Sequence, residues 1–168
     1  MDQQVTNHPA ARNATSVERK GDRELVVTRT FDAPPSIVFK VWSDPDLFRL
    51  WWVPKGAPMT LVSCDMDVRT GGKYRLEFEA GGQRMTFYGK YLDVVPGERI
   101  VWTNDEEGEE GGVTTVTFED RGGKTQLTFH EAYPTAQALE DAMTGSAAGL
   151  PTQLDQLEEL LSTFELPS

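Results

Sequence analysis

The chain has 168 residues and a formal net charge of −11 at pH 7, with 27 acidic and 16 basic side chains. The length fits one domain with a short tail, and the acidic balance disfavours nucleic acid, which is bound by clustered Lys and Arg. No apolar run approaches the roughly 18 residues of a membrane-spanning helix, so membrane insertion is not expected. The lack of a secretory signal pattern and the single cysteine predict a soluble, cytoplasmic protein.

The chain is expected to divide into a tail and one folded domain. Residues 1–22 are polar without a hydrophobic period, which predicts a disordered N-terminal extension. The domain is expected over residues 23–166. It begins with a strand in which Leu25, Val27 and Phe31 share one face.

Two short helices are predicted after this strand. A proline pair ends the strand, and one apolar face over Pro35–Ser43 predicts the first helix. Asp44 as N-cap and Pro45 at the first helical position predict the start of the second helix. That helix carries the aromatic residues Trp51 and Trp52.

An antiparallel meander is predicted next, because short apolar-rich segments are separated by Gly-rich turns. Its six strands are expected over Met59–Met66, Lys73–Glu79, Met85–Val94, Glu98–Asn104, Val113–Glu119 and Thr125–Glu131.

An acidic run lies within Asn104–Gly112. We interpret it as a solvated loop, and the alternative is a docking patch for a basic partner.

The chain is predicted to end in a long helix from Gly149 to Phe164. At 1.5 Å per residue it would span roughly 24 Å, enough to cross a seven-stranded sheet. Its leucines share one face, and polar residues such as Gln153 and Gln156 are expected mostly outside it.

The sequence offers few groups for catalysis or metal binding. His130 is the only histidine and Cys64 the only cysteine in the predicted domain, which is too few for a zinc or iron site. The glycine pairs sit in hairpin turns, so no nucleotide, metal or other cofactor is expected. His130 is interpreted as structural and Cys64 as inert core, with a Cys64–His130 pair as the alternative. Asp67 and Arg69 are expected to have a structural role beside a turn.

Aromatic side chains exceed what a simple alternating sheet needs. Their polar tips among apolar walls are typical of a pocket lining, although for each residue an ordinary core is the alternative. Small residues at Gly89, Gly145 and Gly149 favour space between helix and sheet. No catalytic residue is predicted, and the predicted ligand-binding residues are Trp52, Tyr74, Leu76, Phe78, Phe87, Tyr91, Trp102, Leu150 and Leu154.

The order of elements and several motifs resemble a known family. The motifs are Arg29-Thr30-Phe31-Asp32-Ala33-Pro34, Trp51-Trp52-Val53-Pro54, Asp67-Val68-Arg69-Thr70-Gly71-Gly72 and the segment from Gly89 to Ile100. They are similar to proteins like the C-terminal domain of the activator of heat-shock protein 90 ATPase, within the START-like (SRPBCC) superfamily.

The resemblance implies an α+β helix-grip fold: a seven-stranded curved antiparallel sheet around a long C-terminal helix, with two short helices between strands 1 and 2. It also implies pairing of the first and last strands, and a cavity near the short helices. Where the family often has Gly-Trp, this chain has Gly149-Leu150, and the missing indole is expected to enlarge or reshape the roof of the cavity.

Three functions remain open. The leading one is binding or carrying a small hydrophobic or amphipathic molecule, including a lipid, in an internal cavity. The alternatives are a polyketide cyclase or aromatase-like enzyme, for which Tyr74, Tyr91, Arg69 and His130 are the available donors, and a chaperone-associated or stress-response interaction module. Enzymatic activity is not favoured, no protein partner is identified, and a monomer or weak dimer is expected.

Overall fold

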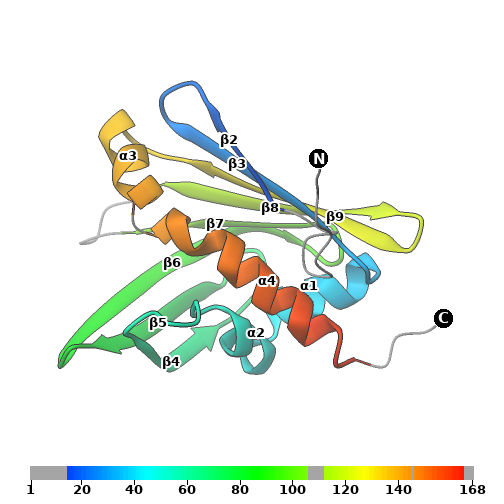
Figure 1. The fold of residues 1–168 in the computed structure, drawn as a ribbon, viewed down its shortest axis with the longest axis horizontal. Helices are drawn as coiled ribbons and strands as arrows, with labels where there is room; N and C mark the ends of the chain where they lie inside the picture. The colour runs from blue at the N-terminus through cyan, green and yellow to red at the C-terminus, as the bar shows by residue number, and fades with distance from the viewer. Residues whose placement is uncertain (1–14, 106–111, 145, 165–168) are drawn as a thin grey trace, which may run out of the picture.

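A computed structural model describes residues 15–105, 112–144 and 146–164 of the chain. In this part, eight strands form one antiparallel sheet in the order β2-β3-β9-β8-β7-β6-β5-β4 (Figure 1). The strands are β2 (Ser16–Lys20), β3 (Glu24–Phe31), β4 (Thr60–Met66), β5 (Lys73–Ala80), β6 (Gln83–Val95), β7 (Arg99–Thr103), β8 (Val113–Arg121) and β9 (Lys124–Ala132).

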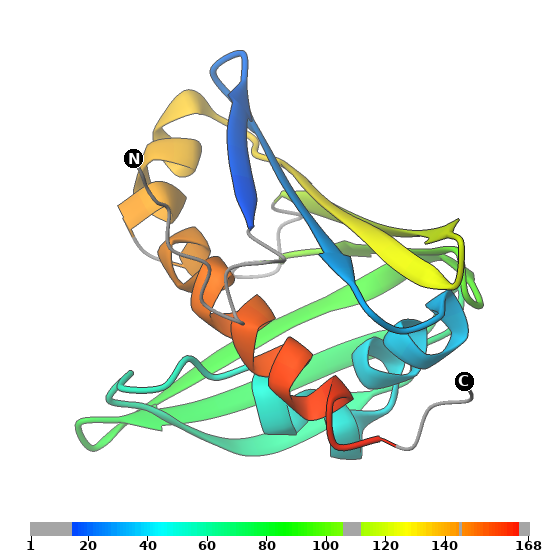
Figure 2. The same cartoon turned by 45° about the vertical axis from the view of Figure 1, so that its right-hand side comes forward.

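The helices lie on one side of this sheet. They are α1 (Pro35–Ser43), α2 (Pro45–Trp51), α3 (Ala136–Thr144), a 3-10 turn η2 (Ser146–Gly149) and α4 (Leu150–Leu161). Figures 1 and 2 show α4 crossing in front of the curved sheet, with α3 at its N-terminal end and α1 and α2 towards its C-terminal end. No helix in the described part of the chain is long and apolar enough to cross a membrane.

The helix-grip prediction is confirmed, and the strand count is corrected from seven to eight. β3 pairs with β9 as the resemblance implies, and the other predicted strands and helices recur with ends shifted by a few residues. The C-terminal helix begins one residue after Gly149 and ends at Leu161 rather than Phe164.

The additional strand is β2, so predicted disorder is wrong for Ser16–Lys20. All five of its side chains are exposed, which is why no hydrophobic period marks it in the sequence. As an edge strand it is held mainly by backbone pairing with β3, in the register Ser16↔Thr28 to Lys20↔Glu24. Residues 1–14 and residues 106–111 of the acidic run lie outside the described part of the chain.

One face of the sheet supplies the core together with α4. Leu25, Val27 and Phe31 are buried on the inner face of β3. Arg29 shares that face and is only 3% exposed. Its guanidinium pairs with Asp155 and with Glu158 on α4, the latter at 3.0 Å. A charge inside the core is tolerated here because α4 supplies two carboxylates.

Two glutamines of α4 are buried, which corrects their predicted place outside the apolar face. Gln153 and Gln156 are 6% and 8% exposed. The side-chain amide of Gln156 donates to the carbonyls of Trp51 and Val53 at 2.9 and 2.8 Å, and Gln153 donates to the carbonyl of Trp52. These carbonyls belong to the last residue of α2 and to the two residues after it, where the end of a helix leaves acceptors unpaired. The glutamines therefore fix α2 against α4.

Candidate functional site

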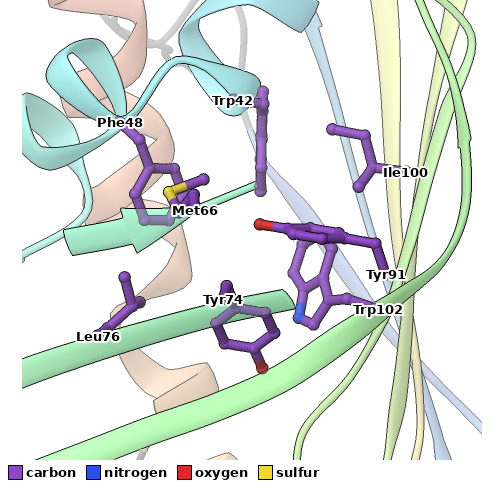
Figure 3. A pocket seen from close by; sticks show the side chains of 8 residues that line it. All are labelled: Trp42, Phe48, Met66, Tyr74, Leu76, Tyr91, Ile100 and Trp102. Carbon is purple, nitrogen blue, oxygen red and sulfur yellow. The ribbon is translucent and has the colours of Figure 1, made fainter. Parts of the chain in front are cut away.

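An inner pocket lies between the short helices and the sheet. α1 and α2 contribute Trp42 and Phe48 to it, and β4 to β7 contribute the rest of the wall (Figure 3). The sheet residues that line it are Met66, Tyr74, Leu76, Tyr91, Ile100 and Trp102.

Trp42 is the centre of the aromatic packing around this pocket. Its ring lies 4.7 Å from Trp51, 6.1 Å from Trp102 and 6.3 Å from Phe129, measured between centroids. Trp42 is 2% exposed, and its Nε1 has no hydrogen-bond acceptor within the described residues. Aromatic rings therefore pack closely around Trp42 between α1 and the sheet.

The inner pocket has a volume of about 40 Å³, enough for a few waters but far below the roughly 300 Å³ of a typical ligand pocket. The predicted internal ligand cavity is therefore not present at that size. Leu150 does not line the inner pocket. The expected space at Gly89 and Gly149 is also occupied. A Cβ on Gly89 would lie 2.0 Å from the carbonyl oxygen of Thr103, and one on Gly149 would lie 2.9 Å from Pro54.

A larger outer pocket lies at one end of the sheet, between β6, the ends of β7 to β9, and α3. Its volume is about 590 Å³, which falls in the range of small-molecule sites. Tyr74 lines both pockets. Several lining residues are exposed, including Asp141 and Thr86, so the outer pocket opens to solvent.

The apolar wall of the outer pocket comes from β6 and α3. Met85 and Phe87 on β6 are 36% and 47% exposed, and Ala138 and Ala142 of α3 line the same pocket. The ring of Phe87 packs edge-on against the buried Phe78, with centroids 5.4 Å apart. Exposed apolar side chains gathered in a pocket of this size are a feature of binding sites.

The polar wall is a chain of hydrogen bonds that starts at Tyr74. The Tyr74 hydroxyl donates to the carbonyl of Thr103 at 2.6 Å and lies 3.4 Å from Oδ1 of Asn104. The Asn104 amide donates to the Thr114 hydroxyl at 2.9 Å, and that hydroxyl donates to Oε2 of Glu131 at 2.7 Å. The other oxygen of Glu131 accepts from the hydroxyl of Tyr133.

Glu131 is the acidic member of this network. Burial raises its pKa, and the hydrogen bonds from Tyr133 and Thr114 and the charge of His130 oppose this shift only in part. Burial is also the main cause of the raised pKa of Tyr74 and of Tyr133. A carboxyl group with a raised pKa in a pocket is typical of functional sites.

The predicted ligand-binding residues are spread over different places. Tyr74, Leu76, Tyr91 and Trp102 line the inner pocket, and Tyr74 and Phe87 line the outer one. The remaining four predicted residues line neither pocket and pack in or against the core: Trp52, Phe78, Leu150 and Leu154.

Apart from Tyr74, sequence reasoning missed the residues of the polar wall. Glu131 continues the inward-facing set of β9 after Leu127 and Phe129, both buried. Because alternate residues of a strand share a face, the pattern places an acid at the next inward position, and this could have identified Glu131 as a candidate. Asp105 and Asn104 carried no such signal, because they fall where a strand pattern ends and an acidic run begins.

Two further predictions concern the other polar candidates. Arg69 pairs with Asp67 through Nε at 2.9 Å, and both side chains are exposed, which agrees with a structural role at the turn. The Cys64–His130 alternative is wrong. His130 contacts Glu24 at 2.7 Å, whereas Cys64 lies on β4 at the far edge of the sheet.

A long C-terminal helix held by a curved antiparallel sheet, with two short helices after the first core strand, defines a START-like helix-grip protein. A structure from Rhodobacter sphaeroides has a TM-score of 0.78 at 20% identity, covering 90% of this chain and 99% of that one. A structure from Chromobacterium violaceum has a TM-score of 0.69 at 31% identity, covering 83% and 97%.

The family follows from the sequence match. Residues 32–162 match the family described as Activator of Hsp90 ATPase homolog 1-like protein, and the chain belongs to that family. Among curated proteins, none matches the chain. Family membership supports a ligand-binding domain in general, while neither the family description nor the structural relatives specify a ligand.

Proposed function

We propose that this protein binds a small amphipathic molecule in the outer pocket. The observation that carries the proposal is the pairing, in about 590 Å³, of an apolar wall with a hydrogen-bonded polar wall. Met85 and Phe87 would contact the apolar body of the ligand, and the network around Glu131 would contact its polar end. The proposal keeps the predicted ligand class and moves the site from the core to the open end of the sheet.

The test is a titration with phenylbutanol, a neutral amphiphile, followed by amide chemical shifts in NMR. We expect the shifts to concentrate at residues 85–88, 104–105, 131–133 and 138–142. Shifts confined to the indole groups of Trp42 and Trp102 would place the ligand in the inner pocket instead. No saturable shift at millimolar ligand would contradict the proposal.

A pair of variants measures the apolar contribution. Phe87→Ala removes a ring from the apolar wall, and the burial of such a ring is worth about 1.5–3 kcal/mol, so we expect at least tenfold weaker binding. Glu77→Ala is the matched control, because this side chain of the same hairpin pairs with Arg75 and Arg84 and does not line the pocket. Equal weakening in both variants would argue against a site at Phe87.

The enzyme alternative has one observation in its favour, the raised pKa of Glu131 beside Tyr133. Mass spectrometry of any small molecule that co-purifies with the protein would separate a carrier from an enzyme. A carrier returns its ligand unchanged after incubation, whereas an enzyme changes its mass or its isomer composition. The chaperone-associated role and the cytoplasmic location stay predictions, to be tested by affinity capture and by cell fractionation.

A further inference from the structure

The outer pocket is acidic. Three of its lining side chains are carboxylic acids from three separate places: Asp105 after β7, Glu131 at the end of β9 and Asp141 on α3. Among the described residues that line it, none is Lys, Arg or His. The electrostatic potential in the pocket therefore favours a positively charged guest.

Asp105 carries the most specific signal. Its backbone N–H donates to the carbonyl of Tyr88 at 3.0 Å, which fixes the residue against β6. Its Oδ1 is buried and has no donor within the described part of the chain. A buried acceptor without a donor is costly, and more so when charged. A cation in the pocket beside this carboxylate would offset part of that cost.

The arrangement favours an organic cation over a metal ion. In the described residues, no group of three or more His, Cys, Asp or Glu side chains is placed to hold a metal. The acids instead share the pocket with the exposed Met85 and Phe87. A guest with an ammonium group and an apolar body satisfies both walls at once.

We propose that the outer pocket selects cationic amphiphiles, namely organic amines whose ammonium group lies against Asp105 and Glu131 and whose apolar body lies on Phe87. This inference rests on the proposed function, because it specifies the ligand class of the same pocket. An ammonium beside Glu131 would also stabilise its carboxylate form and so oppose the effect of burial.

The test compares three probes with the same apolar body: phenylbutylamine, phenylbutanol and phenylbutyrate. Calorimetry and amide shifts are recorded on the full chain at neutral pH and moderate salt. We expect the amine to bind at least tenfold more tightly than the alcohol, and the carboxylate to bind most weakly. The amide shifts must locate all binding at the outer pocket.

Three variants separate the pocket from the general charge of the molecule. Asp105→Asn and Glu131→Gln are each expected to lower the affinity ratio of amine to alcohol about tenfold. Glu79→Gln removes the same charge from an exposed position on β5 and should leave the ratio within about twofold, as expected of a solvent-screened charge. Melting curves verify that each variant is folded. The comparison of the three probes on the wild-type protein tests the proposal even if a variant does not fold.

The outcomes are distinguishable. Equal binding of amine and alcohol, both weakened by Phe87→Ala, would overturn the cation selectivity and leave the pocket in place. An equal effect of Glu79→Gln and Asp105→Asn would assign the preference to net charge and overturn the inference. Absence of any probe from the outer pocket would overturn the proposed function as well.

Discussion

Two tyrosines line the inner pocket, and within the described part of the chain only one of them has a hydrogen-bond partner for its hydroxyl. Tyr74 donates to the carbonyl of Thr103 at 2.6 Å. Tyr91 is 5% exposed and its hydroxyl has no partner among the described residues. In Figure 3 the Tyr91 oxygen points into the pocket, towards the side of Trp42 and Met66. The two tyrosines lie on neighbouring strands but differ in whether their hydroxyl group donates a hydrogen bond to a described residue.

The difference predicts unequal effects of removing the two hydroxyl groups. Tyr74→Phe should lower the free energy of unfolding by about 1 kcal/mol, because it breaks a partly buried hydrogen bond. Tyr91→Phe should cause no loss, since no partner is left unpaired. Urea denaturation of both variants measures the difference. Equal losses would mean that the Tyr74 hydrogen bond contributes nothing specific.

Glu131 predicts a pH dependence of stability with a definite sign. Its pKa is raised in the folded state by burial, so the folded state binds this proton more tightly than the unfolded state. The contribution to stability is largest below the unfolded pKa of about 4.3 and falls as pH rises through the folded pKa. The titratable groups around it are Tyr74, His130 and Tyr133, with Asp105 and Asp141 in the same pocket.

The check is the difference in unfolding free energy between Glu131→Gln and wild type across the pH range. The variant should gain stability relative to wild type as pH rises. Glu77 is the control of opposite sign, because its hydrogen bond with Arg75 lowers its pKa in the folded state. Glu77→Gln should lose stability relative to wild type over the same rise. If the difference in unfolding free energy between Glu131→Gln and wild type did not change with pH, the pKa of Glu131 would be the same in the folded and unfolded states.

At the scale of elements, the attachment of α4 is partly ionic. Arg29 on β3 has a side chain only 1% exposed, and it pairs with Asp155 and Glu158, which are 54% and 23% exposed. Removing both acids would leave a buried guanidinium without an anion. Removing the arginine would leave acids that reach water.

This asymmetry makes a prediction about the β3–α4 contact. The double variant Asp155→Asn, Glu158→Gln should lose about 3 kcal/mol of unfolding free energy, the cost of an uncompensated buried charge. Arg29→Met should lose less, and adding it to the double variant should recover most of the loss. Chemical denaturation of the three proteins gives these values. A triple variant as unstable as the double one would contradict the account.

At the scale of the whole molecule, β2 extends the sheet beyond what the hydrophobic pattern predicted. It contacts the rest of the protein through its ladder with β3 and through an ion pair between Arg19 and Glu140 of α3 at 2.5 Å. Thr15, just before it, accepts from Arg29 at 3.0 Å. The segment therefore links the edge of the sheet to α3 and to the α4 anchor.

A truncation tests this contribution. A chain that begins at Gly21 lacks β2 and should melt roughly 4–8 °C lower, the shift expected of about 2 kcal/mol in a protein of this size. Deleting only residues 1–14, the part of the predicted N-terminal extension that lies before β2, is the control. Thermal melts of the two chains decide the point, and equal melting temperatures would show that β2 adds nothing to stability.

The sequence by itself determined the order and type of the elements in the core. Periods of two and 3.6 residues and the N-cap at Asp44 are local signals, and the structure has α2 and the strands of the meander where they predict. Inward and outward faces of the strands also followed from alternation. β2 left no such signal, because backbone pairing does not depend on side-chain type.

Only the tertiary structure decided where there is space. The volume of a pocket is the small difference between the volume that the helices and strands enclose and the volume of the side chains inside it. It therefore depends on contacts between residues far apart in the sequence. Trp42 and Trp102 nearly close the expected inner cavity. The larger pocket arises where α3 meets the ends of β7 to β9. The meeting of Asp105, Glu131 and Asp141 there is likewise a product of topology, since no local pattern joins them.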